Sequence, residues 1–206
     1  MVFFAVSTAS ANIFATNPSG SWQNLNPSGG YGNTLGIPFT VGASPVSVTT
    51  LGFFDELGNG LDSAHTVGIY ALSQTLLGSV TIPSGTSAVL HDGTRWTDLG
   101  APITLDANTG YVLAFTLLDS GDRVNDAFLA QVTIDPLFSL SGTGFTFAEG
   151  TSLQYPAAEY VDPFFDFDAF GGNLQATAIP EPKSWLLLSI PAVVASCVLR
   201  RRSRSC

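Results

Sequence analysis

The chain has 206 residues, of which 11% are charged and 45% hydrophobic, and it carries 21 Gly, 12 Pro and 15 Phe. This length suits one main domain with terminal segments, and the scarcity of charge favours strands and loops over helices. Residues 1–179 hold 15 acidic and 2 basic residues, a net charge of −13, which argues against nucleic-acid binding because phosphate backbones would repel this part.

The amino-terminal residues, MVFFAVSTASANIFATN, resemble part of an export signal. Residues 2–6 form a short apolar core, and Ala9, Ser10 and Ala11 have the small side chains of a cleavage site, but no positive region precedes them. We therefore expect residues 1–17 to be the remainder of a signal peptide whose natural start lies upstream. The alternative is an ordinary first strand.

Between residues 20 and 178, apolar segments of strand length alternate with turn residues. Such spacing predicts an all-β domain, and we expect a β-sandwich of jelly-roll-like architecture. The stretch YVLAFTLL is apolar on both faces, which predicts a central strand. Strands are expected at residues 37–41, 46–54, 66–72, 76–82, 102–105, 111–118, 128–134, 144–147 and 174–179.

One long stretch of this region, LGFFDELGNGLDSAHTVGIYALSQTLLGSVTIPSGTS, combines an aromatic–Asp pair, a Gly-rich turn, Ser-x-His and Val-Gly-Ile-Tyr. With the later RWTDLGAPITLDANTGYVLAF, it resembles a β-sandwich domain of unknown function found in bacterial surface proteins. The resemblance covers roughly residues 20–135. It implies a fold and a setting, but no reaction.

The sequence predicts no catalytic site. His65 and His91 are the two histidines, with Asp62 and Asp92 near them, but no nucleophile elbow, zinc-binding or nucleotide-binding motif accompanies them. We expect His65 to tie a turn through hydrogen bonds and His91 to lie on a surface loop.

A calcium site is the one cofactor site that the sequence suggests. The turn DELGNGLD offers oxygen ligands on Asp55, Glu56, Asn59 and Asp62, although the spacing matches no known calcium loop. The alternative is a solvated acidic loop. A second acidic stretch around residues 162–168 is a weaker candidate.

Aromatic residues in loop or edge contexts suggest a glycan-binding surface, because sugar rings pack on exposed aromatic side chains. The candidates are Trp96, Tyr160, Phe164 and Phe165. The alternative is that these rings pack under a long loop.

The carboxyl-terminal residues have the features of a membrane anchor. Residues 185–199 carry no charge and would form a helix of about 22 Å, which flanking Lys183 and Arg200 could extend toward the ~30 Å of a bilayer core. We expect a single transmembrane helix whose basic cluster stays cytoplasmic while the acidic domain lies outside. The alternative is a helix packed on the domain. The basic cluster is Arg200, Arg201, Arg202 and Arg204.

The order Pro180-Glu181-Pro182, apolar helix, arginine cluster resembles the PEP-CTERM sorting signal of Gram-negative bacteria, over residues 180–206. The resemblance implies recognition and cleavage near Pro180, Glu181 and Pro182 by an exosortase-type membrane enzyme in species that make extracellular polysaccharide.

We therefore expect a non-enzymatic, exported protein that is held transiently in the inner membrane and then acts at the cell surface or outside it. Its partners would be the exosortase-type enzyme, the inner membrane and extracellular polysaccharide. Two alternatives stay open, a secreted glycan-acting hydrolase on the same sandwich and a surface protein that keeps its anchor.

Overall fold

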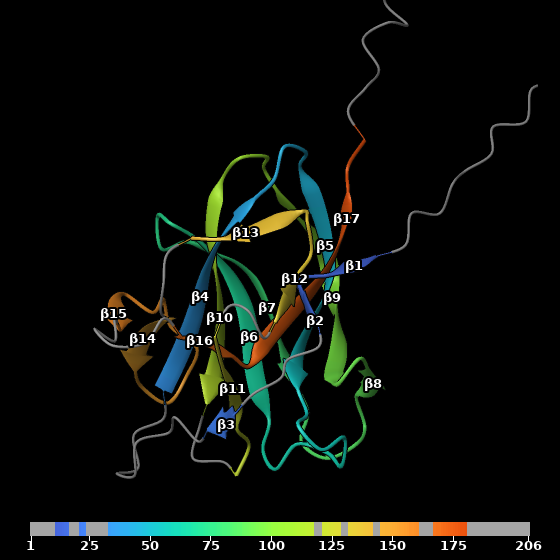
Figure 1. Cartoon of the computed structure of the whole chain (residues 1–206), viewed down its shortest axis with the longest axis vertical. Coiled ribbons are helices and arrows are strands. Elements are labelled where there is room, and N and C mark those ends of the chain that lie inside the picture. Colours follow the sequence, from blue (N-terminus) through green and yellow to red (C-terminus); the bar gives the residue numbers. More distant parts are fainter. Residues whose placement is uncertain are drawn as a thin grey trace, which may run out of the picture.

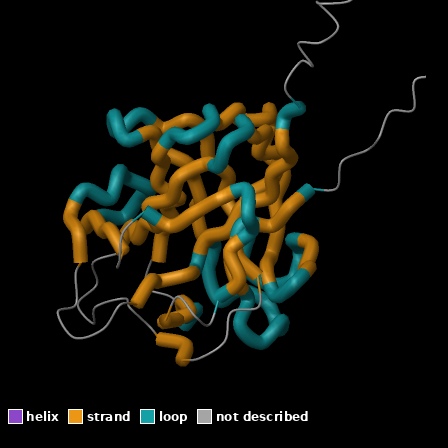
Figure 2. The backbone as a smooth tube through the Cα atoms, turned by 45° about the horizontal axis from the view of Figure 1, so that its top comes forward, coloured by secondary structure: helices purple, strands orange, loops and turns teal. Residues whose placement is uncertain are grey.

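The structure, a computed structural model, describes residues 11–16, 21–23, 33–117, 121–128, 132–141, 145–160 and 167–180. In these residues every regular element is a strand (Figure 1), and the trace of the same part in Figure 2 contains strands and loops but no helix. The all-β class expected from the sequence is thus confirmed. Among these residues, none forms a helix long and apolar enough to cross a membrane.

Two larger antiparallel sheets form the body of the molecule. The five-stranded sheet has the order β1 (Asn12–Ile13), β17 (Gly172–Ala178), β5 (Val46–Phe54), β9 (Thr94–Leu105) and β8 (Val89–His91). The seven-stranded sheet has the order β15 (Ala158–Tyr160), β14 (Phe145–Glu149), β4 (Asn33–Val41), β10 (Gly110–Leu117), β6 (His65–Ala71) and β7 (Leu76–Ile82), with β13 (Phe138–Leu140) also paired to β4.

Two small sheets complete the fold. One consists of β16 (Phe167–Phe170), β11 (Val124–Phe128) and β3 (Ser21–Gln23), and the other of β12 (Thr133–Ile134) and β2 (Ala15–Thr16). Their strands are far apart in sequence, so these sheets tie both ends of the domain to its middle.

The core lies between the two larger sheets in a β-sandwich-like arrangement. Side chains on alternate positions of a strand point to the same face, so each larger sheet contributes one apolar face. A single hydrophobic cluster contains buried residues from both sheets. Its largest fully buried members include Leu51 and Phe53 of the first sheet and Leu35, Ile37, Phe39, Ile69 and Phe115 of the second.

Strand β10 is the central strand that the sequence predicts. It pairs with β4 on one side and β6 on the other, and its residues from Tyr111 to Leu117 are all buried. The face of β10 that points away from the core is covered by residues 152–156, where Tyr155 contacts Tyr70 edge-on at 5.6 Å. Gly36 and Gly68 allow this cover to lie close, because a Cβ there would collide with Pro156 or Leu153.

The sandwich begins earlier than residue 20. Asn12 and Ile13 pair with β17, and Phe14 is fully buried against Phe39 and Phe138 at ring distances of 5.3 Å. The sequence-based expectation places residues 12–16 in the signal peptide, before a domain that starts near residue 20. The structure instead includes residues 12–16 in the folded domain. The expected cleavage site at Ala9 to Ala11 directly precedes them, and the signal peptide itself stays a prediction.

Two expected strands differ from the structure. The expected strand at residues 128–134 is divided between β11 and β12, which belong to different sheets. The strand expected at 102–105 is the end of β9, which already starts at Thr94. Near Gly100 and Pro102 the pairing of β5 with β9 shifts register, and such a bulge accommodates a proline that an ordinary ladder position would not.

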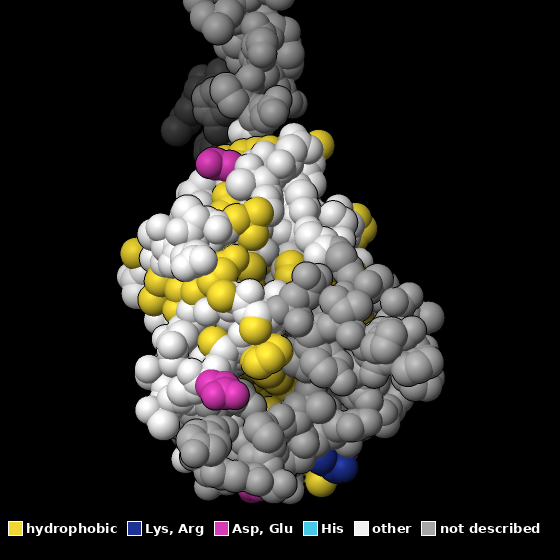
Figure 3. Space-filling view, turned by 90° about the vertical axis from the view of Figure 1, so that its left-hand side faces the viewer, with side chains coloured by type: hydrophobic (Ala, Val, Ile, Leu, Met, Phe, Trp, Pro, Cys, Tyr) yellow, Lys and Arg dark blue, Asp and Glu magenta, His cyan; other side chains and the backbone are white. Residues whose placement is uncertain are grey.

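The low charge content is visible on the surface. Figure 3 shows the side of the molecule that carries β14 and β15, where hydrophobic side chains gather between uncharged polar groups and few acidic or basic side chains are seen. On the described part of this face, charged side chains are thus uncommon.

Candidate functional site

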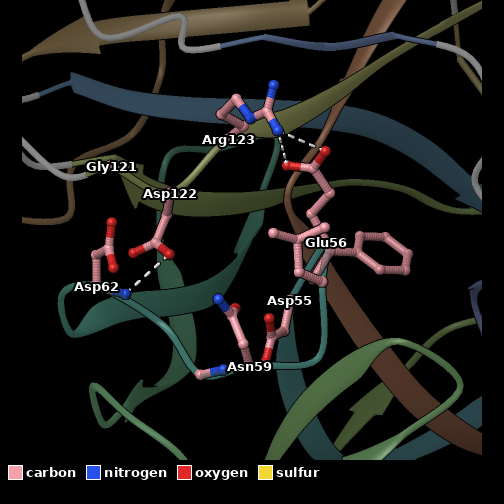
Figure 4. Close-up of a pocket in the computed structure, with 10 residues that line it drawn as sticks. Asp55, Glu56, Asn59, Asp62, Gly121, Asp122 and Arg123 are labelled. Carbon is pink, nitrogen blue, oxygen red and sulfur yellow. Dashed lines mark hydrogen bonds and ion pairs between the residues drawn. The ribbon is translucent and has the colours of Figure 1, made fainter.

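The turn DELGNGLD lies at one end of the sandwich, between β5 and β6, and faces residues 121–123 (Figure 4). Together these two segments line a hollow of about 120 Å³. The turn depends on glycine at Gly58 and Gly60, whose φ angles of 66° and 110° are costly for other residues. Leu61 closes the turn by exchanging two backbone hydrogen bonds with Gly85, at 3.2 and 2.7 Å.

Asp55 forms a buried ion pair with Arg95 of β9. The Asp55 Oδ2 atom accepts hydrogen bonds from Arg95 Nε and from the Gly60 amide, both at 2.9 Å. The other guanidinium nitrogens of Arg95 donate to the carbonyls of Thr86, Ala88 and Gly58 at 3.1 to 3.3 Å. Only 3% of the Asp55 side chain and 5% of the Arg95 side chain are exposed. This buried pair connects the turn at residues 55–62 to the loop at residues 86–88.

Glu56 pairs with Arg123, with an oxygen–nitrogen distance of 2.6 Å. This pair is more exposed, at 20% for Glu56 and 43% for Arg123. Arg95 and Arg123 are the two basic residues of residues 1–179, and both therefore pair with neighbouring carboxylates of one turn.

The four residues proposed for calcium do line this end of the molecule, but their oxygens are not left together for a cation. Asp55 and Glu56 are each paired with a guanidinium group, and Asp62 is exposed, with its backbone amide donating to Asp122 Oδ1 at 2.9 Å. Asn59 lines the same hollow. The described residues contain no cluster of three His, Cys, Asp or Glu side chains suited to a metal ion. A calcium site here stays a prediction, and a bound ion would have to compete with two arginines.

His65 takes part in a second buried contact beside this hollow. It starts β6, is fully buried and stacks on Phe53 with ring centroids 3.8 Å apart. Its Nδ1 atom lies 2.7 Å from the carbonyl oxygen of Thr116, and its Nε2 atom lies 2.9 Å from Asp122 Oδ2. His65 does connect segments through hydrogen bonds, as expected, but it does so from the first position of β6 and not from a loop. Its carboxylate partner is Asp122 and not Asp62, the acid nearest in sequence.

The electrostatics of Asp122 reflect this contact. Burial alone raises the pKa of the carboxyl group, but hydrogen bonds from His65 and from the amides of Asp62 and Ser63, together with the charge of His65, lower the pKa overall. Asp122 is therefore held as a carboxylate that joins the segment before β11 to the start of β6.

The pair of His65 and Asp122 lacks the arrangement needed for nucleophilic catalysis. A general base must keep a ring nitrogen within hydrogen-bond reach of the nucleophile. Both ring nitrogens of His65 already contact acceptors, and the ring is fully buried. His91, in contrast, is exposed and lies 3.4 Å from the carboxylate of its neighbour Asp92.

The structure separates the aromatic candidates for glycan binding. Trp96 lies in β9 of the five-stranded sheet and Tyr160 ends β15, the edge strand of the other sheet. Phe164 and Phe165 lie outside the described residues, as does the acidic stretch at 162–166. Trp96 is the candidate whose side chain can be placed, and it is 7% exposed, with its indole nitrogen donating to the His91 carbonyl at 3.1 Å.

The proposed sorting motif begins where the sandwich ends. The amide of Ile179 donates to the carbonyl of Pro45 at 2.8 Å, and the next residue, Pro180, is exposed. Glu181 and Pro182, the expected helix at residues 185–199 and the arginines at 200, 201, 202 and 204 lie outside the described residues.

Comparison with known proteins identifies the domain but not its activity. A crystal structure of the IBDV viral particle contains a chain with 12% sequence identity and a TM-score of 0.23, and the match covers 89% of this chain and 45% of the viral one. At that similarity it supports no conclusion about fold or function. No curated protein matches the chain. The model of a family described as "Domain of unknown function (DUF4082)" matches residues 15–164, well over half of the chain, and the chain belongs to this family.

Proposed function

We propose that this chain is a non-enzymatic, exported protein whose sandwich acts at the cell surface or in the extracellular polysaccharide, after a membrane-bound processing enzyme removes its tail. The observation that carries the proposal is the order of features after β17. The amide of Ile179 makes the last backbone hydrogen bond of the described residues, and the sequence continues directly with Pro180-Glu181-Pro182, an uncharged 15-residue segment and four arginines.

The physical chemistry of this tail supports a membrane anchor with a defined direction. Prolines at 180 and 182 restrict the backbone to extended conformations, so the motif would offer an accessible strip to an enzyme. The uncharged segment would span the bilayer, and the arginines would keep its end in the cytoplasm. The domain, with its net charge of −13, would then lie on the opposite side.

The resemblance to PEP-CTERM signals supports an exosortase-type enzyme as the partner. The absence of cysteine from residues 1–179 is compatible with export, because no thiol there can mispair. A role without catalysis fits the histidine contacts described above, in which both ring nitrogens of His65 are occupied.

The test is expression of the full-length chain with and without its native exosortase, followed by mass spectrometry of the released protein. We expect release to require the enzyme and the released chain to end near Pro180–Pro182. Glu181→Gln should abolish release, whereas Glu149→Gln, which removes one charge from an exposed position of β14, should not.

Two results would contradict the proposal. Release of the Glu181→Gln variant at the parent level would mean that the motif is not recognised. A cell-surface protein that retains residues 185–206 in the presence of the enzyme would instead indicate a permanently anchored protein.

A further inference from the structure

The outward face of the five-stranded sheet carries a groove lined by Thr50, Val89, His91, Trp96, Asp98 and Gln175, with a volume of about 370 Å³. We call this the outer-face groove. Strand pairing explains why these residues meet. Gln175 of β17, Thr50 of β5 and Asp98 of β9 lie side by side across three strands, and Trp96 and Val89 are paired in the adjacent row. Leu51 and Phe53, which alternate with Thr50 along β5, point into the core instead.

Trp96 is the floor of the groove. It lies over Gly52 of β5, where an added Cβ would come within 2.5 Å of the indole atom Cε3. Because Gly52 has no side chain, the indole ring sinks toward the sheet and its N–H group reaches the His91 carbonyl. The groove therefore has a fixed aromatic base, not a ring that must be ordered when a ligand binds.

The sides of the groove carry hydrogen-bonding groups that point outward. Asp98 is exposed, and its Oδ1 atom accepts a hydrogen bond from Thr50 Oγ1 at 3.1 Å, which orients the carboxylate. Among the described residues no cation pairs with it. Because only 7% of Trp96 is exposed, the carboxylate and the amide beside it supply most of the contacts that a ligand could make. Such groups suit a ligand that presents several hydroxyl groups, which is the chemistry of a sugar ring.

The negative charge of the domain favours neutral polysaccharides over acidic ones as ligands. Asp98 lies in a domain with a net charge of −13, so a polysaccharide rich in uronate or sulfate would be repelled. Neutral hexose units meet no such barrier, and their hydroxyl groups can donate to the carboxylate.

A second hollow of about 410 Å³ has His91 in its lining as well. The second hollow is lined on its other side by residues 11–13 and 133–136. Each volume lies in the ~300–1,000 Å³ range of small-molecule sites, so each hollow has the size to hold a sugar unit.

We propose that the outer-face groove binds a neutral polysaccharide, with Trp96 as its base and Asp98 and Gln175 as the groups that hydrogen-bond to hydroxyls. The choice of a polysaccharide rests in part on the extracellular setting of the proposed function. The geometry of the groove does not depend on how the tail is processed.

The test is affinity electrophoresis of the full-length chain, kept soluble with a mild detergent, in native gels that contain a neutral glucan such as laminarin or dextran, or an acidic polymer such as polygalacturonate. We expect retardation in at least one neutral glucan and none in polygalacturonate. Asp98→Asn and Gln175→Ala should each weaken binding at least tenfold. Asp106→Asn is the matched control, because it removes the same charge from an exposed aspartate outside the groove.

The outcomes separate this inference from the proposed function. Glu181→Gln should be retarded as strongly as the parent, since it leaves the groove intact, even though it should block release from cells. Three results would overturn the inference. The parent could migrate equally with and without every neutral glucan, or it could be retarded more strongly by polygalacturonate. Asp98→Asn and Asp106→Asn could also lose binding affinity to the same extent. Thermal midpoints of the variants within about 3 °C of the parent would show that weaker binding does not reflect unfolding.

Discussion

Replacing Arg95 should destabilise the domain strongly, because Arg95 and Asp55 form a buried ion pair. Arg95→Met keeps the length and apolar character of the side chain but removes the ion pair with Asp55 and the hydrogen bonds to the carbonyls of Thr86, Ala88 and Gly58. The Asp55 carboxylate would stay buried, with the Gly60 amide as its remaining partner.

Removing one member of a buried ion pair typically costs about 3–5 kcal/mol, because the other charge stays desolvated without compensation. For a domain of this size, 1 kcal/mol corresponds to roughly 2–4 °C, so the thermal midpoint should fall by roughly 6–20 °C. Arg123→Met is the matched control. Its pair with Glu56 is partly exposed, and loss of a surface ion pair typically costs about 0–1 kcal/mol.

The assay is urea unfolding of both variants and the parent at pH 7, followed by tryptophan fluorescence. A third variant, Asp55→Leu with Arg95→Met, should recover part of the lost free energy of unfolding, because no unpaired charge is left inside. If Arg95→Met lost no more free energy than Arg123→Met, the buried pair could not be what fastens these two loops.

Two further predictions concern other contacts of the sandwich. Asp122→Asn should reduce the stability of the domain at pH 7 and make that stability less dependent on acid pH. Folding lowers the pKa of Asp122, so this carboxylate stabilises the domain above its unfolded pKa of about 3.9. The stabilisation is lost as the pH falls through the pKa of the folded state. Urea midpoints of parent and variant between about pH 2.5 and 7 measure this, and parallel curves would refute it. Gly52→Ala should cost about 1–3 kcal/mol, because a Cβ would come within 2.5 Å of Thr94 and Trp96. Gly100→Ala, with no atom within 4 Å of its added Cβ, should be nearly neutral. Thermal melts of both glycine variants and the parent measure the difference, and equal effects would contradict the packing argument.

The features that the sequence predicted well depend on neighbouring residues. The expected strands at 46–54 and 76–82 coincide with β5 and β7, since apolar runs between turn residues are local signals. The structure also has a turn at Asp92 and Gly93, where positive φ angles of 48° and 70° favour this residue pair. The same reasoning joined residues 128–134 into one strand, because no local signal marks the change from one sheet to another.

The candidate site was harder to predict because its contacts join distant residues. Asp122 lies 57 residues from His65, and Arg95 lies 40 residues from Asp55. From sequence, Asp55, Glu56, Asn59 and Asp62 look like ligands for a hard cation, and the proximity of two arginines depends on the fold. One signal did exist. Residues 1–179 hold 2 basic residues against 15 acidic ones, so each arginine has many possible carboxylate partners.

The shortage of basic residues also bears on which acidic residue is functionally informative. Both arginines of the sandwich pair within one turn, so Asp55 and Glu56 are explained by holding loops together. Asp98 has no such explanation: it is exposed, has no cationic partner among the described residues, and is oriented by Thr50 beside the buried ring of Trp96. An acidic group kept on an otherwise weakly charged sheet face, next to a fixed aromatic surface, is better suited to a ligand than to stability. The outer-face groove, and not the acid-rich turn, is therefore where a ligand of this sandwich should first be sought.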